Sequence, residues 1–447
     1  MKVTSTGGRA LWVAADFLFL ILCSSTGLSA QPAAPLAGPV RLSLEAAVQA
    51  ALVNNASILL ASQSEIQSAL AVRERRAALL PSFDAIAGYT EQTVSLGAIG
   101  LQIDGVPIPN KVGPFGTTEA QLRFSDELLD LSLIRRYQAA KRSSSATELE
   151  TTALRQKVAA MVGRLYFAVK RDDALVSAAQ AQVALNEKLL DLATTRKASG
   201  AGIGLDVTRA ASRLASDRRQ LLQTQTDRRI AQYQLLRAMG QRLDANLELT
   251  DSLSDSSFAA GELDAAIRSA LDTRLELRAS SQRISASHQT EAAAQAERLP
   301  TLHSYANLNG VNAGGATVST YLVGVELRIP LWDGSATAAR RGIAASQLKQ
   351  DEIRDRDLRA EVELEVRIAY ANFTAAREQT LASTQALELA QTELDQAEVR
   401  FEAQIATQIE VITGQANLAE ARTAQVDAWF ALKCAEIEFK RATGVKL

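Results

Sequence analysis

Apolar residues recur at helical spacing along two long parts of the chain. One set recurs every four residues: Leu154, Val158, Val162 and Tyr166. A second set alternates spacings of three and four, the heptad stripe of packed long helices: Leu387, Ala390, Leu394, Ala397 and Phe401. No proline falls between 131 and 199 or after Pro330. Because proline breaks helices, we predict very long helices in both stretches, and a helix over 131–199 would measure roughly 100 Å.

Four shorter segments instead alternate apolar and polar residues with period two. The pattern is clear in 118–125 and 321–329 and weaker in 82–90 and 301–309. It predicts strands with one apolar and one polar face. Each segment has about nine residues, the length of a tilted strand that crosses a bilayer. We predict two hairpins, 82–90 with 118–125 and 301–309 with 321–329. Their loops differ: the first is long and rich in glycine and proline, and the second is short, over 310–320.

The whole arrangement occurs twice. Shifted by 219 residues, segment 44–48 lies on 263–267, and Leu80-Pro81 lies on Leu299-Pro300. Farther along, a shift of 204 residues places Tyr166 on Tyr370. The first copy therefore has a 15-residue insertion after Pro81, in its hairpin loop. We predict a first repeat over 42–240, a connector over 241–262 and a second repeat over 263–447, in a mainly α fold with a small β part.

The N-terminus has the pattern of an export signal. Basic Lys2 and Arg9 precede a mostly apolar stretch over 11–23, and small residues follow up to Ala30. We predict a signal peptide over 1–30 and a proline-rich linker over 31–41. The alternative is a retained anchor helix, although the stretch is short for a membrane span. Lipid attachment at Cys23 stays open, although Leu22 stands where such cysteines usually follow a small residue.

Composition argues against several functional classes. The 48 basic and 50 acidic residues nearly cancel, so no basic surplus attracts nucleic acid. The chain has two histidines and, once the signal is removed, one cysteine, which makes a metal site or a Cys/His nucleophile implausible. Phosphate-loop and Gly-x-Ser-x-Gly patterns are absent from the sequence. We therefore predict no enzyme activity, no catalytic residue, no cofactor and no metal.

Four isolated strands cannot cross a membrane alone. Their open edges would leave backbone groups unpaired in lipid, and membrane barrels begin at about eight strands. Oligomerisation solves this, since two copies supply eight strands and three supply twelve. The alternative is a small soluble sheet packed on long helices, in an exported or cytosolic coiled-coil scaffold protein without a channel.

Three segments together resemble the TolC-like outer-membrane efflux protein family, also called outer membrane factors. They are 325–334 (VELRIPLWDG), its counterpart 128–132 (LLDLS) and the opening helix 42–55, and the resemblance covers 42–444. It implies a homotrimer whose twelve strands form one barrel in outer-membrane lipid. The long helical hairpins would form a hollow α-helical barrel through the periplasm of a Gram-negative type envelope.

The same resemblance implies a role and partners. The assembly would be the exit duct of a tripartite efflux or type I secretion system. It would join an inner-membrane pump (resistance-nodulation-division, ABC or other) through a periplasmic adaptor protein. The sequence leaves the transported substrate and the kind of pump open.

The resemblance also suggests residues at the helical tips. The family pattern of an Arg, a Gly four residues on and then an acidic residue fits Arg196, Gly200 and Asp206. In the second copy it fits Arg400 and Glu410, with Gln404 where Gly is usual. Candidates for adaptor docking are Arg196, Gly200, Arg400 and Gln404. Candidates for a cation-attracting aperture are Glu410 and Asp206, although Thr413 stands where some members place a second acidic residue. The alternative for both carboxylates is a solvated position in the first turn of a helix.

Overall fold

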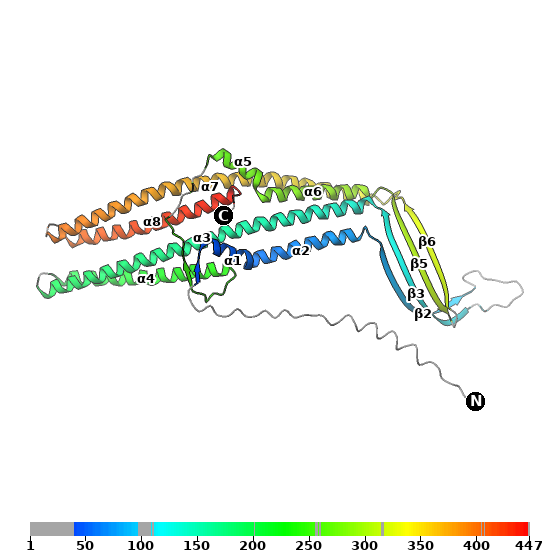
Figure 1. The fold of residues 1–447 in the computed structure, drawn as a ribbon, viewed down its shortest axis with the longest axis horizontal. Helices are drawn as coiled ribbons and strands as arrows, with labels where there is room; N and C mark the ends of the chain where they lie inside the picture. Colours follow the sequence, from blue (N-terminus) through cyan, green and yellow to red (C-terminus); the bar gives the residue numbers. More distant parts are fainter. Residues whose placement is uncertain are drawn as a thin grey trace, which may run out of the picture.

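The computed structural model describes residues 40–96, 109, 111–200, 202–254, 258, 261–313, 317–403, 405 and 407–445. The predicted signal peptide, Cys23, residues 31–39 of the linker and Gln404 lie outside these residues. The molecule is elongated, with helical hairpins at one end and four strands at the other (Figure 1). This is the predicted mainly α fold with a small β part.

The same order of elements occurs in both copies. The first has α1 (Leu44–Asn54), α2 (Ala56–Ala77), β2 (Ser82–Ser95), β3 (Lys111–Leu129), α3 (Leu131–Ala198) and α4 (Gly204–Ala238). The second has α5 (Leu263–Thr273), α6 (Leu275–Ala296), β5 (Thr301–Ala313), β6 (Thr317–Arg328), α7 (Ala336–Glu402) and α8 (Gln408–Ala442). Two short strands, β1 (Val40–Leu42) and β4 (Leu247–Leu249), pair in parallel. The predicted long helices are confirmed, since α3 has 68 residues and α7 has 67.

The four longer strands form one antiparallel sheet in the order β2-β3-β5-β6. Pairing puts Phe83 opposite Phe124, and Leu308 between Leu122 and Tyr321, so these apolar side chains share one face. The other face is mainly polar, with cross-strand pairs such as Asp84–Arg123, Gln121–Asn309 and His303–Glu326. The register therefore builds the predicted apolar and polar faces across the whole sheet.

The strands are longer at their loop ends than predicted. Strand β3 begins at Lys111 and passes through Gly113, Pro114 and Gly116, which the sequence pattern assigns to the loop. An irregularity opposite Gln92 and Val94 accommodates them, as bulges do, so pairing continues beyond these residues. In the second copy Gly310 pairs with Ser319, so the prediction of a loop over 310–320 was wrong. Glycine and proline mark irregular backbone, but at a bulge or a sheet edge they do not end a strand.

Aspartates cap the long helices where they leave the sheet. Asp130 Oδ1 accepts hydrogen bonds from the backbone N–H groups of Ser132 (2.7 Å) and Leu133 (3.1 Å) at the start of α3. Near the start of α7, Asp333 accepts from the backbone and side chain of Thr337. These hydrogen bonds lower the pKa of the Asp333 carboxyl. The two segments that resemble each other in sequence thus perform the same local task.

The largest core cluster surrounds Tyr166 in the middle of α3. Its ring is fully buried with Leu235 and Met239, which come from the end of α4. Its hydroxyl lies 2.9 Å from the carbonyl oxygen of Leu42 and 2.6 Å from a carboxylate oxygen of Asp251. Burial, together with the hydrogen bond to Asp251, raises the pKa of Tyr166 to about 12. This contact fastens the start of the first repeat and the connector to α3.

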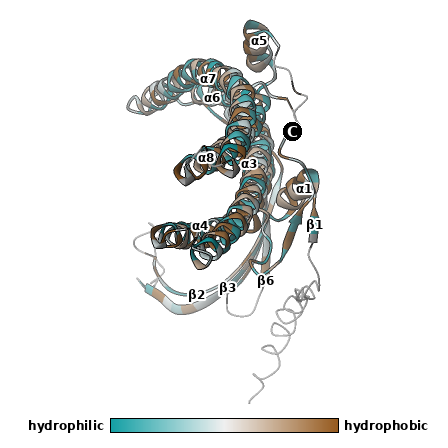
Figure 2. Ribbon diagram, turned by 90° about the vertical axis from the view of Figure 1, so that its left-hand side faces the viewer, coloured by the Kyte–Doolittle hydropathy of each residue, from teal (hydrophilic) through white to brown (hydrophobic). Residues whose placement is uncertain are grey.

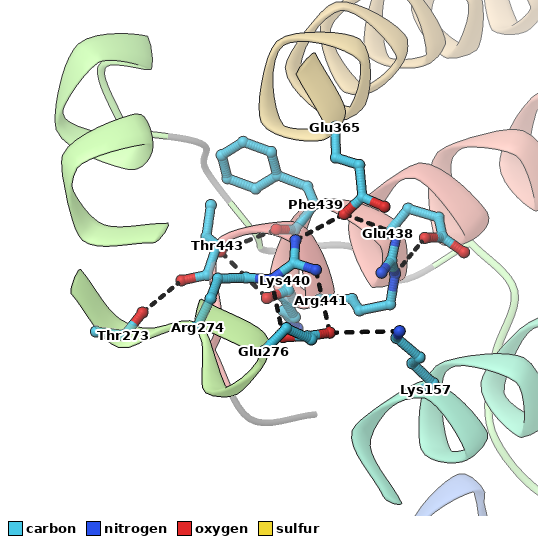
Figure 3. A network of polar contacts seen from close by, with 10 residues as sticks. All are labelled: Lys157, Thr273, Arg274, Glu276, Glu365, Glu438, Phe439, Lys440, Arg441 and Thr443. Carbon is cyan, nitrogen blue, oxygen red and sulfur yellow. Dashed lines mark hydrogen bonds and ion pairs between the residues drawn. The ribbon is translucent and has the colours of Figure 1, made fainter. Parts of the chain in front are cut away.

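The breaks between the short helices are fastened differently in the two copies. In the first, Asn55 caps α2 and donates from Nδ2 to the carbonyl oxygen of Ala238 (2.7 Å). The equivalent position in the second is Arg274, which is 5% exposed. Its guanidinium donates to Glu276 (3.1 and 3.2 Å) and to Glu365 on α7 (2.6 Å) (Figure 3). A neutral amide therefore joins the first copy to its long helices, and a buried cation joins the second.

Candidate functional site

The helices form a single curved layer with two different edges. Near the tips the order of neighbours is α4-α3-α8-α7, and near the strands it is α2-α3-α6-α7. Viewed end-on, this layer is an arc (Figure 2). One edge consists of β2, α2 and α4, and the other of β6 and α7. Among the described strands, β2 and β6 are each hydrogen-bonded to a neighbour on one side only.

Both edges leave large apolar side chains exposed. Helix α2 exposes Leu59, Leu60, Ile66 and Leu70, and α4 exposes Leu222 and Ile230. Helix α7 exposes Ile343, Ile353, Leu364, Ile368, Leu381 and Leu389. Extended apolar surface of this kind marks a contact with another molecule. Since the two edges are unlike, a contact between copies that covered both edges would be head-to-tail; such contacts give a ring where the rotation closes and an open filament where it does not.

At the first tip, Gly200 makes the turn between α3 and α4. Its φ of 77° lies in the left-handed region, which glycine adopts without strain. Helix α4 begins at Gly204, four residues after Gly200. Asp206 lies in the first turn of α4 and is half-buried.

At the second tip, Glu410 takes part in the start of α8. It forms a capping box with Thr407, whose backbone N–H lies 3.4 Å from Glu410 Oε1. Glu410 Oε2 also lies 3.8 Å from Arg400 Nη2 at the end of α7. The structure thus brings two candidate residues together and gives Glu410 the first-turn position that was the alternative to an aperture role.

The two tips touch through Arg196 and Phe401. The guanidinium carbon of Arg196, at the end of α3, lies 4.8 Å from the centre of the Phe401 ring at the end of α7. This is the geometry of a cation–π contact. Phe401 belongs to the predicted heptad stripe, but its contact with Arg196, which lies in the other repeat, does not follow from any sequence pattern.

Sequence reasoning missed the apolar side chains that surround the tips. They are exposed on both hairpins: Ile203, Leu205, Val399, Ile405 and Ile409. Two of them, Ile203 and Ile405, lie in the turns themselves, where polar residues are usual. That departure was a signal available in the sequence.

Of the helices in the described part of the chain, none alone has the length and apolar composition of a membrane span; α1 and α2, which meet at a bend of 45°, reach these only as a pair.

Comparison with known proteins identifies the family. Residues 47–241 and 266–445 match the outer membrane efflux protein family. The chain belongs to this family. Comparison with curated protein sequences finds no match. The resemblance of 42–444 to TolC-like channels is thus confirmed, and the chain is an outer-membrane efflux channel protein.

Solved structures show the same fold as this efflux protein. The outer membrane protein VceC of Vibrio cholerae has a TM-score of 0.76 and 18% identity, over 90% of this chain and 96% of VceC. The CmeC outer membrane channel of Campylobacter jejuni has a TM-score of 0.77 and 17% identity, over 90% and 85% of the two chains. The open state of the MtrE outer membrane channel of Neisseria gonorrhoeae has a TM-score of 0.75 and 16% identity, over 90% and 89%.

Proposed function

We propose that three copies of this chain close edge to edge into an exit duct. The observation that carries the proposal is the pair of unlike, unpaired edges that runs the whole length of the molecule, from β2 and β6 to α4 and α7. Pairing β6 of one copy with β2 of the next removes both open edges of the four-stranded sheet. Three copies give the twelve strands that the family resemblance implies.

The sheet supports a position in the outer membrane. Its apolar face carries Phe83, Leu122, Leu308 and Tyr321 in adjacent strands, as a lipid-facing surface requires. The polar face then lines the pore. The helical hairpins extend from the other end of the strands, and we place them in the periplasm.

The tips are the proposed contact with a periplasmic adaptor and, through it, with an inner-membrane pump of the resistance-nodulation-division, ABC or another class. The exposed apolar side chains around Ile203 and Ile405 support a protein contact there. Arg196, Gly200, Arg400 and Gln404 remain the proposed docking residues.

The aperture is proposed to lie at the same tips, with Glu410 and Asp206 facing it. Arg400 offsets part of the Glu410 charge in this structure. Separating the hairpins of one copy would break the Arg196–Phe401 contact, which costs about 1 kcal/mol at an exposed site.

Paired edge variants test the closed ring. Leu60 on α2 and Ile353 on α7 are exposed on opposite edges, and each lies about 26 Å from the strand-side end of its helix. Leu60→Asp and Ile353→Asp should each leave the detergent-purified chain monomeric by light scattering. Ala184→Asp, an exposed position on α3 between two neighbouring helices, is the matched control and should stay trimeric.

Mixing the two edge variants distinguishes assembly into a ring from other modes of assembly. Each variant retains one intact edge, and these intact edges are complementary, so the mixture should form heterodimers and stop there. Trimers of either variant alone, or homodimers formed through like edges, would contradict the proposal.

A further inference from the structure

Three ionisable side chains lie side by side on the polar face of the sheet. In the strand register His303 of β5 is opposite Glu127 of β3 on one side and opposite Glu326 of β6 on the other. Directly opposed residues in antiparallel strands point to the same face. All three lie within a few residues of the ends at which their strands meet the helices.

The imidazole of His303 is held between its neighbours. Its Nδ1 lies 3.2 Å from Glu127 Oε1, yet this buried nitrogen is not aligned for a hydrogen bond with the carboxylate. The ring stacks on Tyr305 of the same strand, with centres 6.1 Å apart and an interplanar angle of 22°. Only about a third of the His303 side chain is exposed. The contact with Glu127 is therefore one that becomes an ion pair when the imidazole gains a proton.

Other charged groups near the row come from the same sheet. Arg328, opposite Thr301, is one step nearer the helices on this face, and Arg123, opposite Asn307, is two steps farther away. In the described part of the chain no three His, Cys, Asp or Glu side chains are arranged to hold a metal ion.

We infer that Glu127, His303 and Glu326 form a selectivity row that favours small cations in the pore. This rests on the proposed function, because only a closed barrel turns the polar face into a pore wall. Each row carries the carboxylates of Glu127 and Glu326. Of the two arginines on this face, Arg123 lies opposite Asp84, so Arg328 offsets one of the two negative charges and the row keeps a net negative charge. Three copies place these rows in a ring, where charges of one sign concentrate ions of the other.

The expected size of the effect follows from Coulomb's law. A unit charge about 10 Å from the pore axis changes the cation concentration there about twofold in water. Three copies multiply the effect, while salt at about 0.1 M screens much of it. Neutralising one carboxylate per copy should therefore lower the ratio of K⁺ to Cl⁻ permeability about two- to threefold.

The test is the reversal potential of the purified channel in planar bilayers under a KCl gradient. Glu127→Gln and Glu326→Gln should each lower the permeability ratio and leave currents present. Asp126→Asn is the matched control: it changes the neighbouring residue of β3, which points to the opposite face, and should leave the ratio unchanged.

Histidine variants test the third member of the row. His303→Lys puts a positive charge between the two carboxylates and should lower the permeability ratio. His288→Lys adds the same charge at the only other histidine of the sequence and should leave the ratio unchanged. Currents with unchanged selectivity in both glutamate variants, or in His303→Lys, would overturn the row alone. Absence of current from every protein would instead contradict the proposed function and, with it, this inference.

Discussion

Replacing Arg274 by methionine tests the ionic joint of the second copy, which consists of the ion pairs of Arg274 with Glu276 and Glu365. The guanidinium is 5% exposed and makes three hydrogen bonds, two to Glu276 and one to Glu365 (Figure 3). Methionine fills much of the same volume but leaves both carboxylates without this partner. Removing one partner of a fully buried ion pair costs about 3–5 kcal/mol.

The cost here falls below that range because neither carboxylate becomes isolated. Glu276 retains Lys157 at 3.6 Å, and Glu365 retains Arg441 at 3.6 Å. The two carboxylate side chains are also 18% and 31% exposed, so water stabilises part of their charge. We expect a loss of about 2–3 kcal/mol in the local free energy of opening.

Hydrogen exchange followed by mass spectrometry measures that opening directly. Amides of 273–277 should exchange about 30- to 150-fold faster in Arg274→Met than in wild type. The control is Arg367→Met, which removes an exposed ion pair with Glu363 on α7 and should change exchange little. Equal acceleration in both variants, or none in Arg274→Met, would refute the assignment of the joint to Arg274.

Three further predictions concern acid, the first hairpin and the membrane. Burial raises the pKa of Glu276, but hydrogen bonds from Arg274 and its charge lower it more, so the net pKa is below its ordinary value of 4.5. The joint is therefore fully stabilising above about pH 4.5 and weakens as the pH falls below that. Hydrogen exchange of the amides of 273–277, corrected for intrinsic rates, should accelerate at pH 3.5 in wild type but change less in Arg274→Met. Asn186 donates to buried Asp217 between α3 and α4, so Asn186→Leu should destabilise the hairpin by about 2 kcal/mol in thermal melts. Adding Asp217→Leu should restore stability. Additive losses in the double variant would mean that the two residues are not energetically coupled. Trp332 is 88% exposed in the segment between β6 and α7, so with Trp12 and Trp429 both replaced by Phe its fluorescence should be quenched by brominated lipids, and quenching only by aqueous iodide would place it in water.

Much of the fold follows from local sequence patterns. The four-residue recurrence around Val158 and the alternation around Val323 each specify an element, and the repeat shifts show that both copies share one topology. The ends of the strands were harder to predict, because glycine and proline, such as Gly113 and Pro114, occur both in bulges and in turns.

Contacts between distant residues were beyond sequence reasoning. Arg274 and Glu365 are 91 residues apart, and Arg196 meets Phe401 from the other repeat. Only the packing of long helices brings such pairs together. The capping contact of Glu410 could have been predicted, since Thr407 three residues earlier completes the capping-box signature.

Ion conduction across a planar bilayer tests most directly the claim that copies of this chain close edge to edge around a pore. The purified chain should give discrete current steps, and Leu60→Asp, which blocks one edge, should give none. A wild-type protein that inserts into the membrane without carrying current, or a Leu60→Asp protein that conducts like wild type, would contradict the claim.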